Sequence, residues 1–332
     1  MSLPQTMTAI VASAPGGPDV LVPATVPVPT PQPGEVLIRV AAAGVNYPDI
    51  AQRRGDYPPP AGHSPHIGLE VSGEIAIPAG PWREGDKVVA LTNGGGYAEY
   101  AVAPAGQVLP APENWSLVDA AALPETWFTI TQTLVMRAGL ASGMSVLITG
   151  AAGGLGGAAI QISRILGAEP IAIVGSAEKA DYVRSLGATA VIRHDTEDVV
   201  VRTLELTGGR GAHRILDMLG GGATARHIDA SAPFGHIVQV ATLGGRDAQV
   251  PLGKLMAKQL TLSGSTLRPQ TPATKAAIAA HLREKVWPAL NDPAFPGPKI
   301  RRFALAQAAD AHRAAEDRGH YGKIVLAAAI SE

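Results

Sequence analysis

The pattern of apolar and polar positions differs between two regions of this chain. Up to about residue 110, short apolar runs such as 35–40 and 86–91 alternate at period two between glycine- and proline-rich turns. This pattern predicts a unit built from many short strands, with the architecture of a barrel. From residue 145 onward, short apolar runs alternate with stretches of helical period. The second pattern predicts a doubly wound parallel β-sheet with helices between its strands.

The expected elements follow from these two patterns. In the first region we expect strands at 7–12, 35–40, 69–76, 86–91 and 96–102, and a short helix near 48–54. The proline density of residues 23–33 predicts extended chain that cannot form a central strand. In the second region we expect strands at 146–149, 171–174, 190–192, 214–218, 236–241 and 260–263. The intervening helices are expected near 156–167, 177–186, 196–207, 222–232 and 252–258.

The two ends of the chain are expected to belong together. A helix is predicted from residue 124 to about 137, and further helices near 272–290 and 305–316. A final strand at 322–327 is expected to rejoin the first region, so the parallel sheet would be an insertion. We therefore place one domain at residues 1–125 and 268–332 and the other at residues 126–267.

A glycine-rich turn follows the first strand of the second region. Gly150, Gly153 and Gly156 are spaced by three residues between that strand and a helix. Glycines allow the backbone to approach a pyrophosphate closely, and the N-terminus of the helix offers free N–H groups and a positive dipole end. The pattern predicts a dinucleotide site. The alternative is a turn that only packs a helix on a sheet.

The end of the next strand indicates which dinucleotide is bound. NAD-binding proteins usually have Asp or Glu at this point, whereas this chain has Gly175 and Ser176, with Lys179 nearby. A small hydroxyl residue and a lysine leave room for a 2′-phosphate and supply a charge to hold it, which favours NADP(H). Ser176 is also a typical helix N-cap, and Lys179 could equally be a solvated surface charge.

Composition excludes several classes of function. Hydrophobic residues make up 46% and charged residues 17% of the 332 residues, and the formal net charge is −1. A globular protein is expected, and nucleic acid or an anionic membrane is not expected as the main partner. The sequence shows no leader and no apolar run near eighteen residues, so we expect a cytoplasmic protein. The absence of Cys excludes disulfides, thiolate zinc ligands and a cysteine nucleophile.

Several segments, in this order and spacing, together resemble a known family. They are Gly44–Asp49, Gln52–Pro60, Ile67–Gly73, Leu123–Thr129, the Gly150 loop, Leu267-Arg268 and Gly322–Leu326. The chain resembles the medium-chain dehydrogenase/reductase superfamily, specifically its zinc-free quinone oxidoreductases related to zeta-crystallin. The likeness is greatest to the p53-inducible quinone oxidoreductase-like branch. The resemblance implies a Rossmann NADP(H)-binding domain inserted into a β-rich GroES-like domain that holds the substrate, and a homodimer.

The resemblance also implies roles for particular residues. Asn46 would lie by the nicotinamide and shape the substrate pocket, while Tyr57 would line its entrance. Tyr47 and Tyr57 are the candidate proton donors, and packing or stacking is the alternative role for both. The remaining residues implied to bind the cofactor, in addition to Asn46, are Thr129, Gly150, Gly153, Gly154, Leu155, Gly156, Gly175, Ser176, Lys179, His194, Thr242, Leu243, Leu267 and Arg268.

No metal is expected at this site. Zinc-dependent relatives have Gly-His-Glu where this chain has Gly68-Leu69-Glu70. An electron-poor quinone accepts hydride without a Lewis acid, so we expect direct hydride transfer from NADPH to a quinone. Reduction of an activated C=C bond in an enone or enoyl thioester remains an alternative, as does a nucleotide-binding protein with little turnover. The edge strand near 260–263 is a candidate surface for pairing with a second copy.

Overall fold

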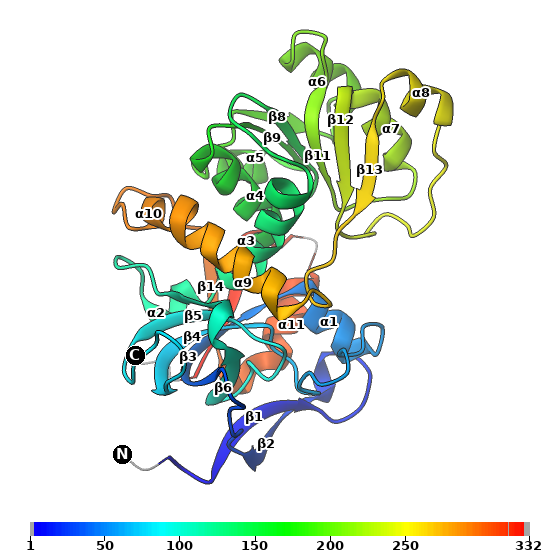
Figure 1. The fold of residues 1–332 in the computed structure, drawn as a ribbon. Coiled ribbons are helices and arrows are strands. Elements are labelled where there is room, and N and C mark those ends of the chain that lie inside the picture. Colours follow the sequence, from blue (N-terminus) through cyan, green and yellow to red (C-terminus); the bar gives the residue numbers. More distant parts are fainter. Residues whose placement is uncertain (1–2, 318, 329–332) are drawn as a thin grey trace. The chain divides into compact units, whose positions relative to one another are not determined.

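The computed structural model describes residues 3–317 and 319–328. The chain forms two compact units (Figure 1). Unit 2 consists of Thr129–Leu267 and Ala294–Pro298, and unit 1 of the described residues on either side of these segments. No helix in the described part of the chain is both long and apolar enough to cross a membrane.

Unit 2 is built on a six-stranded parallel sheet. Counted within this unit, its strands lie in the order 3-2-1-4-5-6, which is the order of a doubly wound dinucleotide-binding sheet. Across the sheet they are β10 (Ala190–Arg193), β9 (Glu169–Val174), β8 (Ser145–Ile148), β11 (Ala212–Asp217), β12 (Ser231–Gln239) and β13 (Thr261–Gly264). The predicted parallel sheet is confirmed.

Helices connect these strands and cover the sheet, as Figure 1 shows in green and yellow. They are α4 (Gly154–Ile165), α5 (Ala177–Ser185), α6 (Val199–Leu206), α7 (Ala223–Ala230) and α8 (Leu252–Ala257). Alternate strand residues such as Ile171 and Ile173 join Ile215, Ile228 and Ile237 in one apolar core. The helices begin and end within three residues of their predicted bounds.

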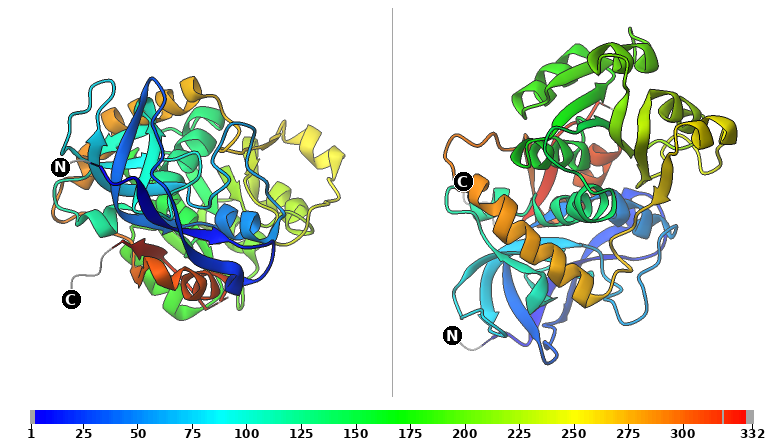
Figure 2. Two further views of the ribbon diagram at one scale, coloured as in Figure 1. Left: turned by 90° about the horizontal axis from the view of Figure 1, so that it is seen from below. Right: turned by 45° about the horizontal axis from the view of Figure 1, so that its top comes forward.

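Unit 1 contains a seven-stranded sheet and a separate two-stranded one. The larger sheet has the order β14 (Ile300–Ala304), β15 (Lys323–Ala327), β3 (Glu35–Val45), β4 (Glu70–Ile77), β5 (Lys87–Leu91) and β7 (Val108–Pro110), while β6 (Tyr100–Pro104) also pairs with β3. The last predicted strand does rejoin the first region, because β15 pairs antiparallel with β3. The two-stranded sheet, dark blue in Figure 2, joins β1 (Thr6–Ala12) to β2 (Leu21–Pro27).

The helices of unit 1 come from distant parts of the sequence. They are α1 (Tyr47–Arg54), α2 (Leu117–Ala120), α9 (Pro272–His281), α10 (Trp287–Leu290) and α11 (Ala308–Glu316), with short 3₁₀ turns at Pro18–Val20, Ala105–Gln107 and Leu305–Gln307. A π-helical turn, Leu282–Val286, joins α9 to α10, and the three run on as one long helix (Figure 2). Helix α3 (Pro124–Ile130) continues through a second π-helical segment, Thr131–Arg137.

Three strands of unit 1, β2, β7 and β14, were not predicted as strands from the sequence. Strand β7 has only three residues, too few to show a period. Strand β14 carries exposed Arg301 and Arg302 at successive positions, so its apolar pattern is interrupted. The proline-rich segment, by contrast, behaves as expected. Pro23 and Pro27 lie in β2, which pairs with β1 alone and is no central strand.

Candidate functional site

The glycine turn of unit 2 leaves the start of helix α4 open. Gly150 has φ +58°, and Gly153 is the N-cap residue of α4 without any side-chain cap. A Cβ on Gly156 would lie 2.5 Å from the Ala151 Cα atom, whereas a Cβ on Gly153 would meet nothing nearer than the Gly150 carbonyl oxygen at 3.5 Å. Gly156 therefore allows helix and turn to pack closely, and the first N–H groups of α4 receive no side-chain cap at Gly153. This arrangement fits a pyrophosphate.

The residues predicted at the adenosine ribose also meet in space. A Cβ on Gly175 would lie 2.8 Å from the His194 Nε2 atom, so the imidazole ring packs directly against this glycine. Ser176 is the N-cap of α5, and its Oγ atom accepts a hydrogen bond from the Lys179 N–H at 3.3 Å. The Ser176 hydroxyl hydrogen stays available to a phosphate, so capping and phosphate binding are compatible. Asp195, the nearest acid after His194, is paired with Arg193.

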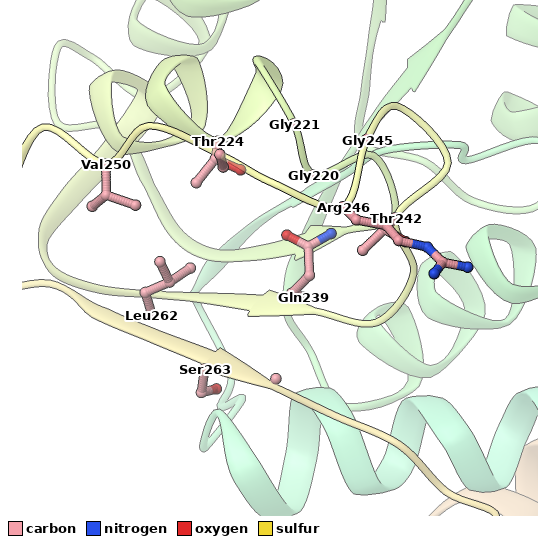
Figure 3. A pocket seen from close by; sticks show the side chains of 12 residues that line it. Gly220, Gly221, Thr224, Gln239, Thr242, Gly245, Arg246, Val250, Leu262 and Ser263 are labelled. Carbon is pink, nitrogen blue, oxygen red and sulfur yellow. The ribbon is translucent and has the colours of Figure 1, made fainter.

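A pocket of about 260 Å³ lies at the carboxyl ends of β12 and β13 (Figure 3). Gln239 stands at its centre, held by hydrogen bonds from its Nε2 atom to the carbonyl oxygens of Asp217 (3.2 Å) and Ala241. Thr242 is one of its lining residues and Leu243 is not. The lining residues are Gly220, Gly221, Thr224, Gln239, Thr242, Gly245, Arg246, Ala248, Val250, Leu262, Ser263 and Gly264.

Thr129 and Leu267, the other two predicted cofactor residues of unit 2, are both buried. Thr129 lies in α3 and Leu267 follows β13. The assignment of all these residues to a cofactor stays a prediction.

In unit 1, Asn46 lies in a buried polar network that the sequence did not reveal. Its Oδ1 atom accepts a hydrogen bond from Lys323 Nζ at 2.8 Å, and its Nδ2 atom donates one to Glu70 Oε1 at 2.7 Å. Lys323 Nζ also contacts Glu70 Oε1 at 2.6 Å. Because an ammonium only donates and a carboxylate only accepts, these partners fix the orientation of the amide. One Nδ2 hydrogen is left for another acceptor.

The network extends to the start of α1. Asp49 accepts hydrogen bonds from the backbone N–H groups of Asn46 (2.8 Å) and Gly68 (3.2 Å). Burial raises the pKa of this carboxyl group from 3.8 to about 7, and the charge of Glu70 adds to the effect. This carboxyl group therefore takes up a proton as the pH falls through about 7.

A second group of buried, hydrogen-bonded side chains extends from the surroundings of Asp49 to α11. His312 contacts Arg53 Nη1 through Nδ1 at 3.1 Å and the Tyr97 hydroxyl through Nε2 at 3.0 Å. Since the guanidinium only donates, His312 Nδ1 accepts, and the ring is neutral with its proton on Nε2. Burial, reinforced by the Arg53 charge, lowers the pKa of His312 from 6.5 to about 3.

The two predicted tyrosines differ in their surroundings. Tyr57 is half-buried beneath Arg268, whose guanidinium carbon lies 5.4 Å from the ring centroid. Arg268 donates from Nη2 to Gln52 Oε1 at 2.7 Å, while its Nε and Nη1 atoms are buried without a partner among the described residues. These orphaned donors fit an anionic or carbonyl group of a ligand. Tyr47, in contrast, is 56% exposed.

Three buried charged residues that the sequence pattern did not reveal lie inside the segments that carry the resemblance. Glu70, Glu125 and Lys323 are each a charged residue within or beside an apolar run. All three are buried, Glu70 with 0% exposure. A charge embedded in an apolar strand was the available signal, because such a residue needs a partner of opposite sign.

Comparisons with known proteins agree with this architecture. Residues 32–113 match the model "Alcohol dehydrogenase GroES-like domain" and residues 154–282 the model "Zinc-binding dehydrogenase". Quinone oxidoreductase from Homo sapiens is 30% identical over 319 residues, which are 94% of each chain. This chain belongs to the quinone oxidoreductase family. The predicted superfamily and the fold, a GroES-like domain with a Rossmann-type sheet, are confirmed.

Two further members of the quinone oxidoreductase family illustrate the likeness. The enzyme from Pseudomonas aeruginosa is 32% identical over 323 residues, covering 94% of this chain and 96% of that one. The structure of Escherichia coli quinone oxidoreductase complexed with NADPH has a TM-score of 0.80 and 27% identity, and covers 97% of this chain and 99% of that one.

The description of one matching model raises the question of zinc within this family. The chain has no Cys, and the Glu70 carboxylate is already engaged by Lys323, Asn46 and the Glu125 backbone N–H. Within residues 3–317 and 319–328, no group of three or more His, Cys, Asp or Glu is arranged to hold a metal ion. The residues present do not fit a thiolate zinc centre.

Proposed function

We propose that this chain is an NADPH-dependent quinone reductase that transfers hydride directly to a quinone-type acceptor. One observation carries the proposal: the open start of α4 behind Gly153, in a chain that matches quinone oxidoreductases along 94% of its length. The structure of the Escherichia coli relative, solved with NADPH, supports the choice of cofactor.

The chain offers residues for each part of the cofactor. When bound, NADPH supplies the hydride. Gly150, Gly153, Gly154, Leu155 and Gly156 would hold its pyrophosphate. Gly175, Ser176, Lys179 and His194 would hold the phosphorylated ribose. Asn46, Thr129, Thr242, Leu243, Leu267 and Arg268 would border the nicotinamide half.

The fixed amide of Asn46 is the chain's own contribution to the chemistry. Its remaining N–H would offer a preorganised donor to a carbonyl oxygen that gains negative charge as hydride arrives. Because Glu70 and Lys323 already hold the amide, no reorganisation is needed at that moment. Such a donor serves the carbonyl of a quinone and of an enone alike, so both belong in the acceptor test.

The experiment follows the absorbance of NADPH and NADH with a panel of quinones, enones and aldehydes. We expect oxidation of NADPH in the presence of quinones and a lower KM for NADPH than for NADH. Turnover of enones with no quinone accepted would replace the proposal by C=C reduction. NADPH binding by calorimetry without oxidation in the whole panel would replace it by a binding function.

We also propose that the chain forms a homodimer through the free edge of β13. Within the part of the chain that the structure describes, this strand pairs only with β12, so its other edge has unpaired backbone groups. Leu262 on β13 and Leu252 and Met256 on the preceding helix α8 are exposed apolar residues. A second copy would cover them. Sedimentation equilibrium is expected to give twice the mass of the chain, and a Leu262→Lys variant half of that; a wild-type monomer would contradict the proposal.

A further inference from the structure

The pocket at the carboxyl ends of β12 and β13 lies mostly outside the residues expected to bind NADPH. Of those residues only Thr242 lines it, and all of its lining residues belong to unit 2. Its volume is about 260 Å³. An apolar cavity of about 150 Å³ is enough to hold benzene. The pocket is therefore large enough for a six-membered ring with polar substituents.

Two glycine-containing loops form one firmly packed side of this pocket. Gly220 and Gly245 form a β-bridge between the loops that follow β11 and β12, and a Cβ on Gly220 would lie 2.8 Å from the Gly245 carbonyl oxygen. The buried Asp217 carboxylate accepts hydrogen bonds from the N–H groups of Leu219 (2.7 Å) and Gly220 (3.0 Å). His227 Nδ1 contacts its other oxygen at 2.7 Å. The pocket is thus held in shape by the protein itself.

Gln239 presents a hydrogen-bond acceptor of fixed orientation to the pocket. Both hydrogens of its Nε2 atom are used, because this atom donates to the main-chain carbonyl oxygens of Asp217 (3.2 Å) and Ala241. Within residues 3–317 and 319–328, no hydrogen bond to Gln239 Oε1 is found. Figure 3 shows this oxygen on the side of Thr224 and the nitrogen on the side of Thr242. The free group of the amide is therefore an acceptor.

Thr224 supplies a second polar group. It is the second residue of α7, it is only 3% exposed, and it lines the pocket. No hydrogen bond to its hydroxyl group is found in the described part of the chain. In Figure 3 the hydroxyl oxygen is turned toward the side on which Gln239 lies. Since a buried hydroxyl group without a partner costs stability, a ligand in the pocket would supply what is missing.

The other side chains of the pocket favour a neutral ligand. Val250 and Leu262 give it an apolar wall. Arg246 is exposed, and its side chain extends away from that wall in Figure 3. An anion would also meet the free oxygen of Gln239, which can only accept a hydrogen bond. A ligand that suits the pocket therefore combines an apolar body with a hydrogen-bond donor.

We infer that this pocket binds a small neutral ring compound of the phenol class. A phenolic hydroxyl group can donate its hydrogen to Gln239 Oε1 and accept one from Thr224, while the ring packs against Val250 and Leu262. A quinone or a phenyl ether has no such hydrogen and leaves Gln239 Oε1 without a partner. The inference does not depend on the proposed function. If that function holds, the pocket accepts the hydroquinone product and rejects the quinone.

The first experiment uses phenol and anisole as probes, because anisole has a methyl group in place of the hydroxyl hydrogen. This comparison leaves Gln239, which also holds the main chain, intact. In calorimetric titration we expect one phenol per chain, and binding of anisole weaker by about tenfold, the effect of a buried acceptor left unpaired. In methyl NMR spectra phenol should shift the signals of Val250 and Leu262. Equal affinities for phenol and anisole, or no binding of phenol, would overturn the inference.

The second experiment changes the pocket. Thr224→Val keeps the shape of the side chain without the hydroxyl group, and phenol should bind about fivefold more weakly. Ala248→Trp fills the pocket from an exposed position and should abolish binding. Thr189→Val is the matched control, since Thr189 is exposed in the same unit and does not line the pocket. Thermal unfolding verifies that each variant is folded. Normal binding of phenol by Ala248→Trp would place phenol elsewhere and contradict the inference.

A titration in the presence of saturating NADPH separates this pocket from the cofactor site. We expect the affinity for phenol to be unchanged, because Thr242 is the one residue that the pocket shares with those expected to bind the cofactor. Competition between phenol and NADPH would make the pocket part of the cofactor site and would overturn the inference. Failure of the proposed function looks different, since NADPH would then not be oxidised while the titrations with phenol alone still decide.

Discussion

Glu70 and Gly44 are in such close contact that the Glu70 Oε1 atom lies 1.9 Å from the place that a Cβ on residue 44 would occupy. The Ala121 carbonyl oxygen, 2.8 Å from the same point, closes the other side. Glycine at position 44 is thus a condition for placing the carboxylate that holds Asn46.

Gly44→Ala is therefore expected to push Glu70 out of its position. We expect the free energy of unfolding to fall by about 1–3 kcal/mol, as for other overpacked cores, and kcat to fall with it. Urea denaturation measures the first effect. Gly17→Ala is the matched control, since no atom lies within 4 Å of its Cβ position and its φ is −69°. Equal stability of the two variants would show that Glu70 has room to move.

Lys323→Met should be strongly destabilising, because it leaves the Glu70 charge buried without its cation. Breaking a buried ion pair by removing one partner costs about 3–5 kcal/mol. The double variant Glu70→Gln/Lys323→Met removes both charges and should be more stable than Lys323→Met alone. A double-mutant cycle from urea denaturation measures the coupling. Additive effects of the two changes would contradict the pairing.

Alanine at the two glycines of the turn should separate packing from ligand binding. Gly156→Ala places a Cβ 2.5 Å from backbone, so we expect a lower melting temperature even without cofactor. Gly153→Ala meets only ordinary contacts, so its melting temperature should stay unchanged while NADPH binding weakens about tenfold or more. Calorimetric titration and thermal unfolding provide the two readouts. Unimpaired NADPH binding by Gly153→Ala would show that the pyrophosphate does not bind at Gly153.

Lys179→Ala tests the preference for the phosphorylated cofactor. Loss of a charged contact to the 2′-phosphate should raise the KM for NADPH about tenfold, which corresponds to ~1.4 kcal/mol, and leave the KM for NADH unchanged. Lys254→Ala is the control, since this lysine is mostly exposed and pairs with Asp229. If the KM values for both cofactors rose equally, Lys179 would not contact the phosphate.

His312 should make stability depend on pH in acid solution. In the native state its pKa is about 3, whereas its ordinary value is 6.5. Between these limits the unfolded chain binds a proton that the native protein does not, so stability is complete above pH 6.5 and declines as the pH falls toward 3. The decline attributable to this group is up to about 1.4 kcal/mol per pH unit.

His312→Gln should lower stability at pH 7 and reduce that decline, because glutamine does not titrate. Urea unfolding of both proteins at pH 5 and pH 7 measures the difference, in which other titrating groups cancel. A constant stability difference between the two proteins at both pH values would mean that His312 has the same pKa in the native and the unfolded state.

The elements that depend only on contiguous residues could be predicted from the sequence. The strand, the glycines at 150, 153 and 156, and the following helix are contiguous, so period and spacing were sufficient to identify β8, the turn and α4. The same holds for Ser176, whose capping role is decided by its immediate neighbours.

The buried network could not be predicted in this way. Lys323 and Glu70 are 253 residues apart, and their contact depends on the pairing of β15 with β3. Glu125 reaches the same place from the start of a third element, α3. No pattern within a single segment indicates that these three residues lie close together. From the sequence, the three charged residues were therefore only parts of the segments that resemble a family.

The position of Lys323 also has a consequence for how the chain is made. At roughly 5–20 residues per second, a ribosome needs about 10–50 seconds to travel from Glu70 to its counter-ion. During that interval the edge of β3 that later pairs with β15 has no partner strand there. The Glu70 carboxylate, which lies beside Gly44, has no Lys323 ammonium to pair with. Unit 2 can be complete earlier, because its residues end at Pro298. The first unit of the nascent chain therefore stays incomplete at this edge of β3 until synthesis has passed β15.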